Sequence, residues 1–148
     1  MTPLFVVLLV GFAVFRAVGF HVPWFADWQH CVRAALGLMF LLTASAHWGK
    51  RRPYLVRMVP QRLGPIAEQM VTLTGIAEIA IAVGLQVPSI APWIAIAAIV
   101  MLCALFPANV KAAREHMSIL DTPCPPVLPR ALAQIFFIAV LALSAWPR

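Results

Sequence analysis

Charged residues are scarce in this sequence: they make up 11% of its 148 residues, whereas 63% are hydrophobic. Soluble globular domains carry about a quarter charged residues. The few charges lie between long apolar runs and not along them, which excludes an ordinary water-soluble domain and predicts a membrane protein. The net charge of +6 follows from the positive-inside rule for membrane proteins, so we expect no nucleic-acid partner.

Several motifs of catalysis and metal binding are also missing. The sequence has no His-Glu-x-x-His zinc motif, no glycine-rich phosphate loop and no Gly-x-Ser-x-Gly nucleophile elbow. Its three cysteines, Cys31, Cys103 and Cys124, are far apart and form no Cys-x-x-Cys redox motif. The sequence therefore gives no support to a metal site, to phosphate chemistry or to a redox centre within the chain.

Five apolar runs are present, and they favour transmembrane helices, which need roughly 20 mostly apolar residues, over the alternating strands of a β-barrel. The predicted spans are about 3–20, 31–48, 66–87, 92–106 and 128–146. Aromatic residues near their ends are typical of membrane interfaces, as at Trp24, Trp48, Tyr54, Trp93 and Trp146. We expect a single all-α transmembrane domain over residues 1–148.

Basic residues are concentrated in two connections between these spans. The connection at 48–65 carries five Lys or Arg residues, and the one at 107–129 carries Lys111 and Arg114. The positive-inside rule places both in the cytoplasm and, with five spans, the N-terminus as well. Arg16, close to the end of the first span, leaves a four-span alternative open, in which the first helix lies at the membrane interface.

Glu78 lies near the middle of the third predicted span. A carboxylate at that depth costs several kcal/mol unless it is protonated or paired. Thr74, four residues earlier, lies on the same helix face. Two interpretations remain open: Glu78 carries a proton or orients a ligand, or it is a neutral residue that joins neighbouring helices through hydrogen bonds.

Candidate partners for Glu78 come from the other predicted spans, at a similar depth. His47 lies near the end of the second span and Asn109 just after the fourth, while Arg130 and Gln134 are four residues apart near the start of the fifth. Taken alone, His47 is typical of an interface and Arg130 of a topology determinant. Together they predict a polar intramembrane pocket with the ligand-binding residues Glu78, His47, Asn109, Gln134, Thr74 and Arg130.

Several of these motifs resemble those of the DoxX-like membrane proteins. The most specific are Thr74-Gly75-x-x-Glu78 and Phe106-Pro-Ala-Asn109, and they occur in the same order and spacing as in that family. The resemblance covers roughly residues 31–146 and leaves the first span outside. It implies a four-helix transmembrane bundle, here with an additional N-terminal hydrophobic helix, in a bacterial cytoplasmic (inner) membrane.

The resemblance also implies a range of functions. Some DoxX-like proteins are small subunits of thiosulfate:quinone oxidoreductases, some join oxidative-stress complexes, and a similar animal protein assists assembly of nicotinic receptors. The redox relatives imply a quinone-like or lipid-like ligand in a pocket near Glu78, His47, Asn109 and Gln134, where the carboxylic acid and the imidazole bond to a quinone oxygen. Because the chain supplies no electron carrier, it would be an accessory subunit of a partner that holds the redox centre.

Two alternatives remain open. The first is a non-enzymatic assembly factor or chaperone that uses the same pocket, and its small-residue helix faces, to hold the helices of another membrane protein. The second is a proton-coupled small-solute transporter with Glu78 as the proton carrier. A chain of this length would have to form a homo-oligomer to enclose a pathway.

Overall fold

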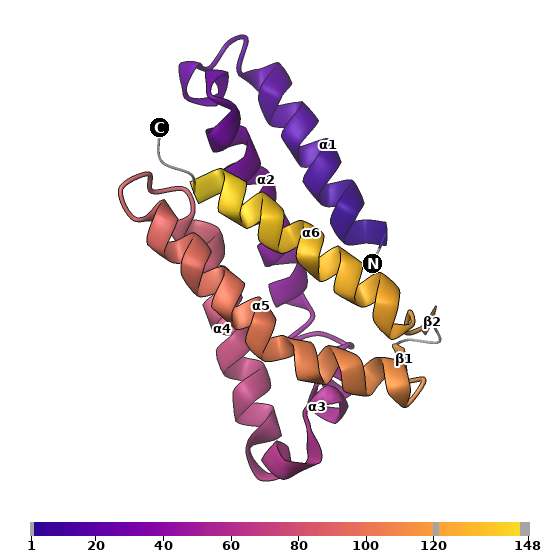
Figure 1. Ribbon diagram of the computed structural model, residues 1–148. Helices are drawn as coiled ribbons and strands as arrows, with labels where there is room; N and C mark the ends of the chain where they lie inside the picture. The colour runs from indigo at the N-terminus through magenta and orange to yellow at the C-terminus, as the bar shows by residue number, and fades with distance from the viewer. Residues whose placement is uncertain (1, 120–121, 146–148) are drawn as a thin grey trace.

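The computed structural model describes residues 2–119 and 122–145, and within these ranges the chain is almost entirely helical (Figure 1). The prediction of an all-α fold is confirmed. The helices are α1 (Thr2–Val18), α2 (Trp28–Ser45), α3 (Arg52–Met58), α4 (Ala67–Gly84), α5 (Ala91–Arg114) and α6 (Val127–Ala145). Two 3-10 helices, η1 (Pro23–Ala26) and η2 (Gln61–Ile66), precede α2 and α4. A short antiparallel pair, β1 (Ser118–Ile119) and β2 (Thr122–Pro123), joins α5 to α6.

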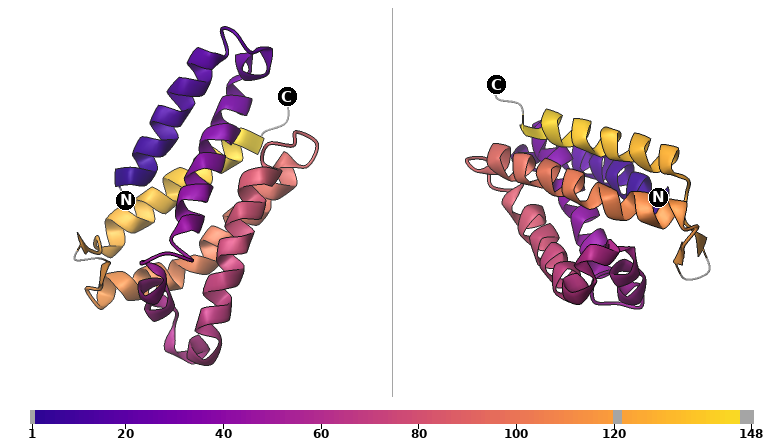
Figure 2. Two further views of the ribbon diagram at one scale, coloured as in Figure 1. Left: turned by 180° about the vertical axis from the view of Figure 1, so that it is seen from behind. Right: turned by 60° about the horizontal axis from the view of Figure 1, so that its bottom comes forward.

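Helix α2 is the centre of the bundle. It packs against α1, α4 and α6, and the view from behind shows it between α1 and α4 (Figure 2). Its buried face carries Leu36 and Phe40, which form one core cluster with Leu85 and Leu141. Helix α1 also reaches α6, where the rings of Phe5 and Phe137 lie with centroids 5.1 Å apart.

Near its N-terminal end, α2 is hydrogen-bonded through polar side chains to α6 and to the segment that follows α4. Asp27 caps the helix by accepting a hydrogen bond from Gln29 N at 2.8 Å. Buried Arg33 donates from Nε to Ser144 O of α6 at 2.9 Å, and Gln86, just after α4, donates from Nε2 to Arg33 O at 3.0 Å. These bonds satisfy polar groups that would be costly to bury alone.

Helix α5 differs from its prediction. The predicted span ended at Phe106, but α5 continues through Pro107 to Arg114. It ends where His116 adopts a left-handed φ of 47°, with His116 N bonded to Ala113 O and Met117 N bonded to Ala112 O. This pattern is a Schellman motif, so a C-cap and not the proline terminates the helix.

Three segments of the described chain are long and apolar enough to cross a membrane: Gln61–Gly84, Ala91–Arg114 and Val127–Ala145. This is fewer than the five predicted spans. Helix α1 is apolar but has 17 residues, and α2 carries Gln29, His30 and Arg33 in its first two turns. Trp146, predicted at the end of the last span, lies outside the described residues, as does Asp121 in the connection before α6.

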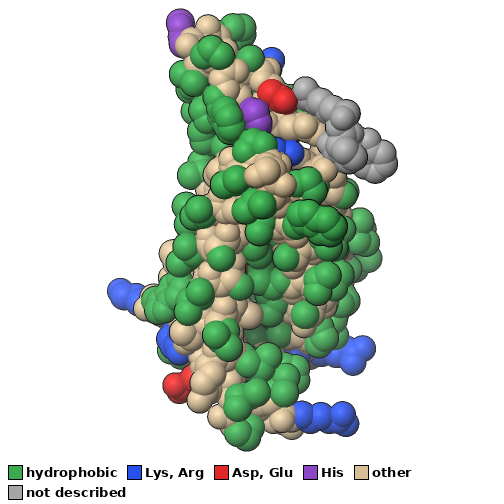
Figure 3. All heavy atoms as spheres, turned by 90° about the vertical axis from the view of Figure 1, so that its left-hand side faces the viewer, with side chains coloured by type: hydrophobic (Ala, Val, Ile, Leu, Met, Phe, Trp, Pro, Cys, Tyr) green, Lys and Arg blue, Asp and Glu red, His purple; other side chains and the backbone are tan. Residues whose placement is uncertain are grey.

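Hydrophobic side chains cover the middle of one face of the bundle, and Lys and Arg side chains gather towards one end (Figure 3). The two basic connections meet in space, because Lys111 Nζ donates to Arg57 O at 2.7 Å and to Val59 O at 2.8 Å. Arg16 satisfies part of its guanidinium through Ala26 O, at 2.8 Å. The membrane side that each connection faces stays a prediction.

Candidate functional site

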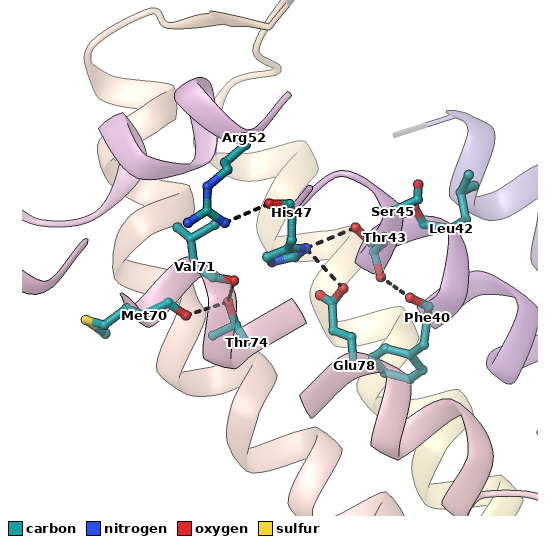
Figure 4. A network of polar contacts seen from close by, with 10 residues as sticks. All are labelled: Phe40, Leu42, Thr43, Ser45, His47, Arg52, Met70, Val71, Thr74 and Glu78. Carbon is teal, nitrogen blue, oxygen red and sulfur yellow. Dashed lines mark hydrogen bonds and ion pairs between the residues drawn. The ribbon is translucent and has the colours of Figure 1, made fainter. Parts of the chain in front are cut away.

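The strongest candidate site is a buried histidine–carboxylate pair between α2 and α4. His47 lies in the turn that follows α2, and Glu78 projects towards it from the middle of α4 (Figure 4). His47 Nδ1 and Glu78 Oε2 are 3.6 Å apart, and each residue is 7% exposed. The structure thus brings together two of the six predicted site residues, His47 and Glu78.

The hydrogen on the His47 ring is directed mainly at the backbone. Nδ1 lies 3.2 Å from Thr43 O, and because a carbonyl oxygen only accepts, this contact is a hydrogen bond in the tautomer that carries its hydrogen on Nδ1. At 3.6 Å, Glu78 Oε2 is beyond normal hydrogen-bond length from the same nitrogen. Within the described residues, Glu78 Oε2 is buried and has no hydrogen-bond partner.

Gly75 makes the close approach of α2 and α4 possible. A Cβ atom at this position would lie 2.8 Å from His47 Cβ and 2.8 Å from Trp48 Cη2, closer than real Cβ contacts allow. The absence of a side chain therefore lets His47 and Trp48 rest on α4, one turn from Glu78. Trp48 is 49% exposed, and its ring centroid lies 6.1 Å from that of His47.

Arg52, the first residue of α3, holds the turn that carries His47. Its Nη1 donates to His47 O at 2.9 Å, and its Nη2 donates to Thr72 Oγ1 at 3.0 Å and to Glu68 O at 3.2 Å. The guanidinium thus links the turn after α2 to the first turns of α4. This positioning role was missed at the sequence level, where Arg52 was assigned only to membrane topology.

Thr74 does not contact Glu78. Its hydroxyl lies 2.9 Å from Met70 O and 3.0 Å from Val71 O, so it bonds to the backbone of its own helix. Thr43, in the last turn of α2, lies beside Glu78 instead (Figure 4). Both threonines are four residues from a site residue, but only the one on the opposite helix faces the carboxylate.

The other three predicted site residues form a separate group between α5 and α6. Arg130 Nη1 donates to Asn109 Oδ1 at 2.7 Å, and Gln134 Nε2 donates to Leu102 O at 3.1 Å. In the described part of the chain, no hydrogen bond or ion pair connects this group to Glu78. The single predicted polar pocket is therefore two polar groups, each at its own helix–helix interface.

Two of the grooves on the described surface are shallow, and neither is lined by Glu78. One, of about 290 Å³, lies along α1 and Leu38, and the other, of about 470 Å³, lies at the basic end between η2 and α5. Neither of these grooves therefore reaches the His47–Glu78 pair.

A comparison with protein-family models assigns most of this chain to a known family. A family model described as a domain of unknown function, DUF8561, matches residues 36–146, about three quarters of the chain. The chain belongs to the DUF8561 family. No curated protein and no solved structure matches the chain.

The DUF8561 match contains both polar groups. His47, Glu78, Asn109, Arg130 and Gln134 all lie within it, as do Gly75 and Trp48. Helix α1 lies outside the matched range. The polar groups of the α2–α4 and α5–α6 interfaces thus both lie in the DUF8561 part of the chain.

Proposed function

We propose that this chain is an integral membrane protein that acts as an accessory subunit and holds the polar head of a quinone-like or lipid-like ligand at the His47–Glu78 pair. Helices α2, α4, α5 and α6 form the four-helix core of this proposal, with α1 against α2, in a bacterial cytoplasmic membrane. The DoxX-like motifs support it, because His47, Glu78 and Gly75 belong to them and carry the pair.

One observation carries the proposal: Glu78 Oε2 is buried without a hydrogen-bond partner in the described chain. Leaving such an atom unsatisfied costs about 1–3 kcal/mol, and more when the group is charged. In the Asn109–Arg130 group, by contrast, the two side chains bond to each other, and among the described residues Arg130 Nε alone of that group is buried without a partner. A ligand that bonds to Glu78 accounts for the remaining unsatisfied carboxyl oxygen.

The chemistry of the pair suits a carbonyl-bearing ligand. A protonated Glu78 donates a hydrogen bond to a carbonyl oxygen, and His47 Nδ1–H, which is 3.6 Å from Glu78 Oε2, can turn from Thr43 O to the same acceptor. We place the entry path beside the exposed Trp48, whose ring lies against Gly75 next to His47. Quinone oxidation or reduction needs a partner subunit with an electron carrier.

The test is to purify the protein in native lipid and identify bound small molecules and proteins by mass spectrometry. We expect a quinone-like molecule at about one per chain in the wild type and its loss in Glu78→Gln. Glu68→Gln is the matched control, because Glu68 is an exposed acid in the first turn of the same helix. It should retain the ligand.

Two outcomes would overturn the proposal. If Glu78→Gln retains the ligand as well as Glu68→Gln does, the carboxyl group is not its binding partner. If wild-type protein carries no small molecule but retains a membrane protein, the chain is an assembly factor that holds the helices of that partner. Both conclusions require that the two variants elute as folded protein from a size-exclusion column.

A further inference from the structure

A second candidate site lies at the basic end of the bundle, away from His47 and Glu78. A groove of about 470 Å³ runs there between η2 and the last turns of α5. Its walls come from two segments that Lys111 holds together through its bonds to Arg57 O and Val59 O. The residues that shape it include Pro60, Arg62, Pro107, Val110, Lys111 and Arg114.

The charges in this groove favour an anion. Arg62 and Arg114 are exposed, and neither side chain has a hydrogen bond or ion pair with any other residue that the structure describes. Lys111 is partly buried and fixed by its two backbone acceptors. Glu115 is the one carboxylate in the lining, so three cations stand against a single negative charge.

The groove is apolar next to these cations. Pro107 and Val110 lie on α5 ahead of Lys111 and Arg114, on the side of the apolar part of the helix. A ligand that fits both parts has an anionic head and an apolar tail. Basic pockets at the ends of membrane-spanning helices bind phospholipid headgroups in this way, with the charged side chains at headgroup level.

We propose that this groove binds the phosphate of an anionic phospholipid, with Arg62 and Arg114 contacting the phosphate oxygens and the acyl chain lying along Pro107 and Val110. Arginine suits this role because its planar N–H fork matches phosphate oxygens. The proposal rests on the membrane embedding proposed above and is independent of any ligand at Glu78.

The experiment titrates the full-length protein in detergent micelles with phosphatidylglycerol or phosphatidylcholine and measures bound lipid by native mass spectrometry. We expect phosphatidylglycerol to bind more tightly than phosphatidylcholine, and the double variant R62Q/R114Q to bind it roughly tenfold or more weakly. The matched control is K50Q/R51Q, which removes two exposed charges from the same basic connection outside the groove. It should bind phosphatidylglycerol like the wild type.

Equal weakening in the two double variants would overturn the proposal, because it would show only general attraction to a basic surface. Unchanged binding in R62Q/R114Q would overturn it too. Competition by inorganic phosphate at low millimolar concentration would identify free phosphate, not a lipid, as the ligand. Cell fractionation tests the proposed membrane embedding separately. If the protein is found in the membrane fraction but binds no lipid selectively, only the lipid-binding inference is contradicted.

Discussion

The α2–α4 interface and the α5–α6 interface both bury polar side chains, but they satisfy them differently. Between α5 and α6, Arg130 bonds to Asn109 at 2.7 Å and Gln134 bonds to a backbone carbonyl at 3.1 Å. Between α2 and α4, His47 and Glu78 approach only to 3.6 Å, and Glu78 Oε2 has no hydrogen-bond partner in the described chain.

This difference suggests that the α5–α6 group joins two helices, whereas the His47–Glu78 pair is available to bind a ligand. A short bond between side chains stabilises the helix contact that it crosses. A buried carboxyl that lacks such a bond lowers stability and persists because surrounding packing holds it in place. Two contacts provide this packing. His47 and Trp48 pack against Gly75, which has no side chain, and Arg52 of α3 donates a hydrogen bond to His47 O in the turn after α2. Arg130 Nε also lacks a partner among the described residues, yet its guanidinium remains bonded to Asn109 through Nη1.

The largest expected effect comes from filling the close contact at Gly75. In Gly75→Ala the new methyl group would lie 2.8 Å from His47 Cβ and from Trp48 Cη2, so the turn after α2 must move away from α4. We expect a loss of about 2 kcal/mol in the free energy of unfolding, as for other overpacked sites. Equilibrium unfolding in mixed micelles, followed by circular dichroism, measures it.

Gly64→Ala is the control for this change. Gly64 lies in η2, and a Cβ atom there has no neighbour within 4 Å, so its unfolding free energy should stay close to that of the wild type. Both substitutions remove the backbone freedom of a glycine, so their difference isolates the contact with His47 and Trp48. Equal stability of the two variants would show that α2 and α4 are not held together at Gly75.

The helices themselves could largely be predicted from the sequence, because hydropathy is a local property. The predicted spans 66–87 and 128–146 agree with α4 and α6 to within three residues at each described end. Helix α5 was predicted too short, since its end depends on the left-handed conformation of His116, and a non-glycine residue gives no local signal for a Schellman motif. Pro107 is accommodated inside the helix instead.

The site could be predicted only in part, because sequence sets the depth of a residue in a helix but not which neighbour its face meets. Of the candidate partners predicted for Glu78, the structure brings His47 close to it. Asn109, Arg130 and Gln134 lie on helix faces that meet each other between α5 and α6. Trp48 was assigned to an interface from its position, and its place over Gly75 follows from the crossing of α2 and α4, which no local pattern encodes.

The next effect in size is the coupling between Asn109 and Arg130. A double-mutant cycle with Asn109→Leu, Arg130→Met and the combined variant isolates their interaction from the other losses that each change causes. For a bond of 2.7 Å between side chains of adjacent helices, we expect a coupling energy of about 1 kcal/mol. Additive effects of the two substitutions would mean that the bond does not stabilise the α5–α6 contact.

The smallest expected effect is the coupling between His47 and Glu78, measured by the same cycle with His47→Gln, Glu78→Gln and both together. Their atoms lie 3.6 Å apart, and the histidine hydrogen is directed at Thr43 O, so we expect less than about 0.5 kcal/mol of coupling in ligand-free protein. A coupling as large as that of Asn109 and Arg130 would make the pair a structural bond and remove the reason to expect a ligand there. Weak coupling, with unfolding free energy nearly unchanged in Glu78→Gln, leaves the carboxyl available for a ligand.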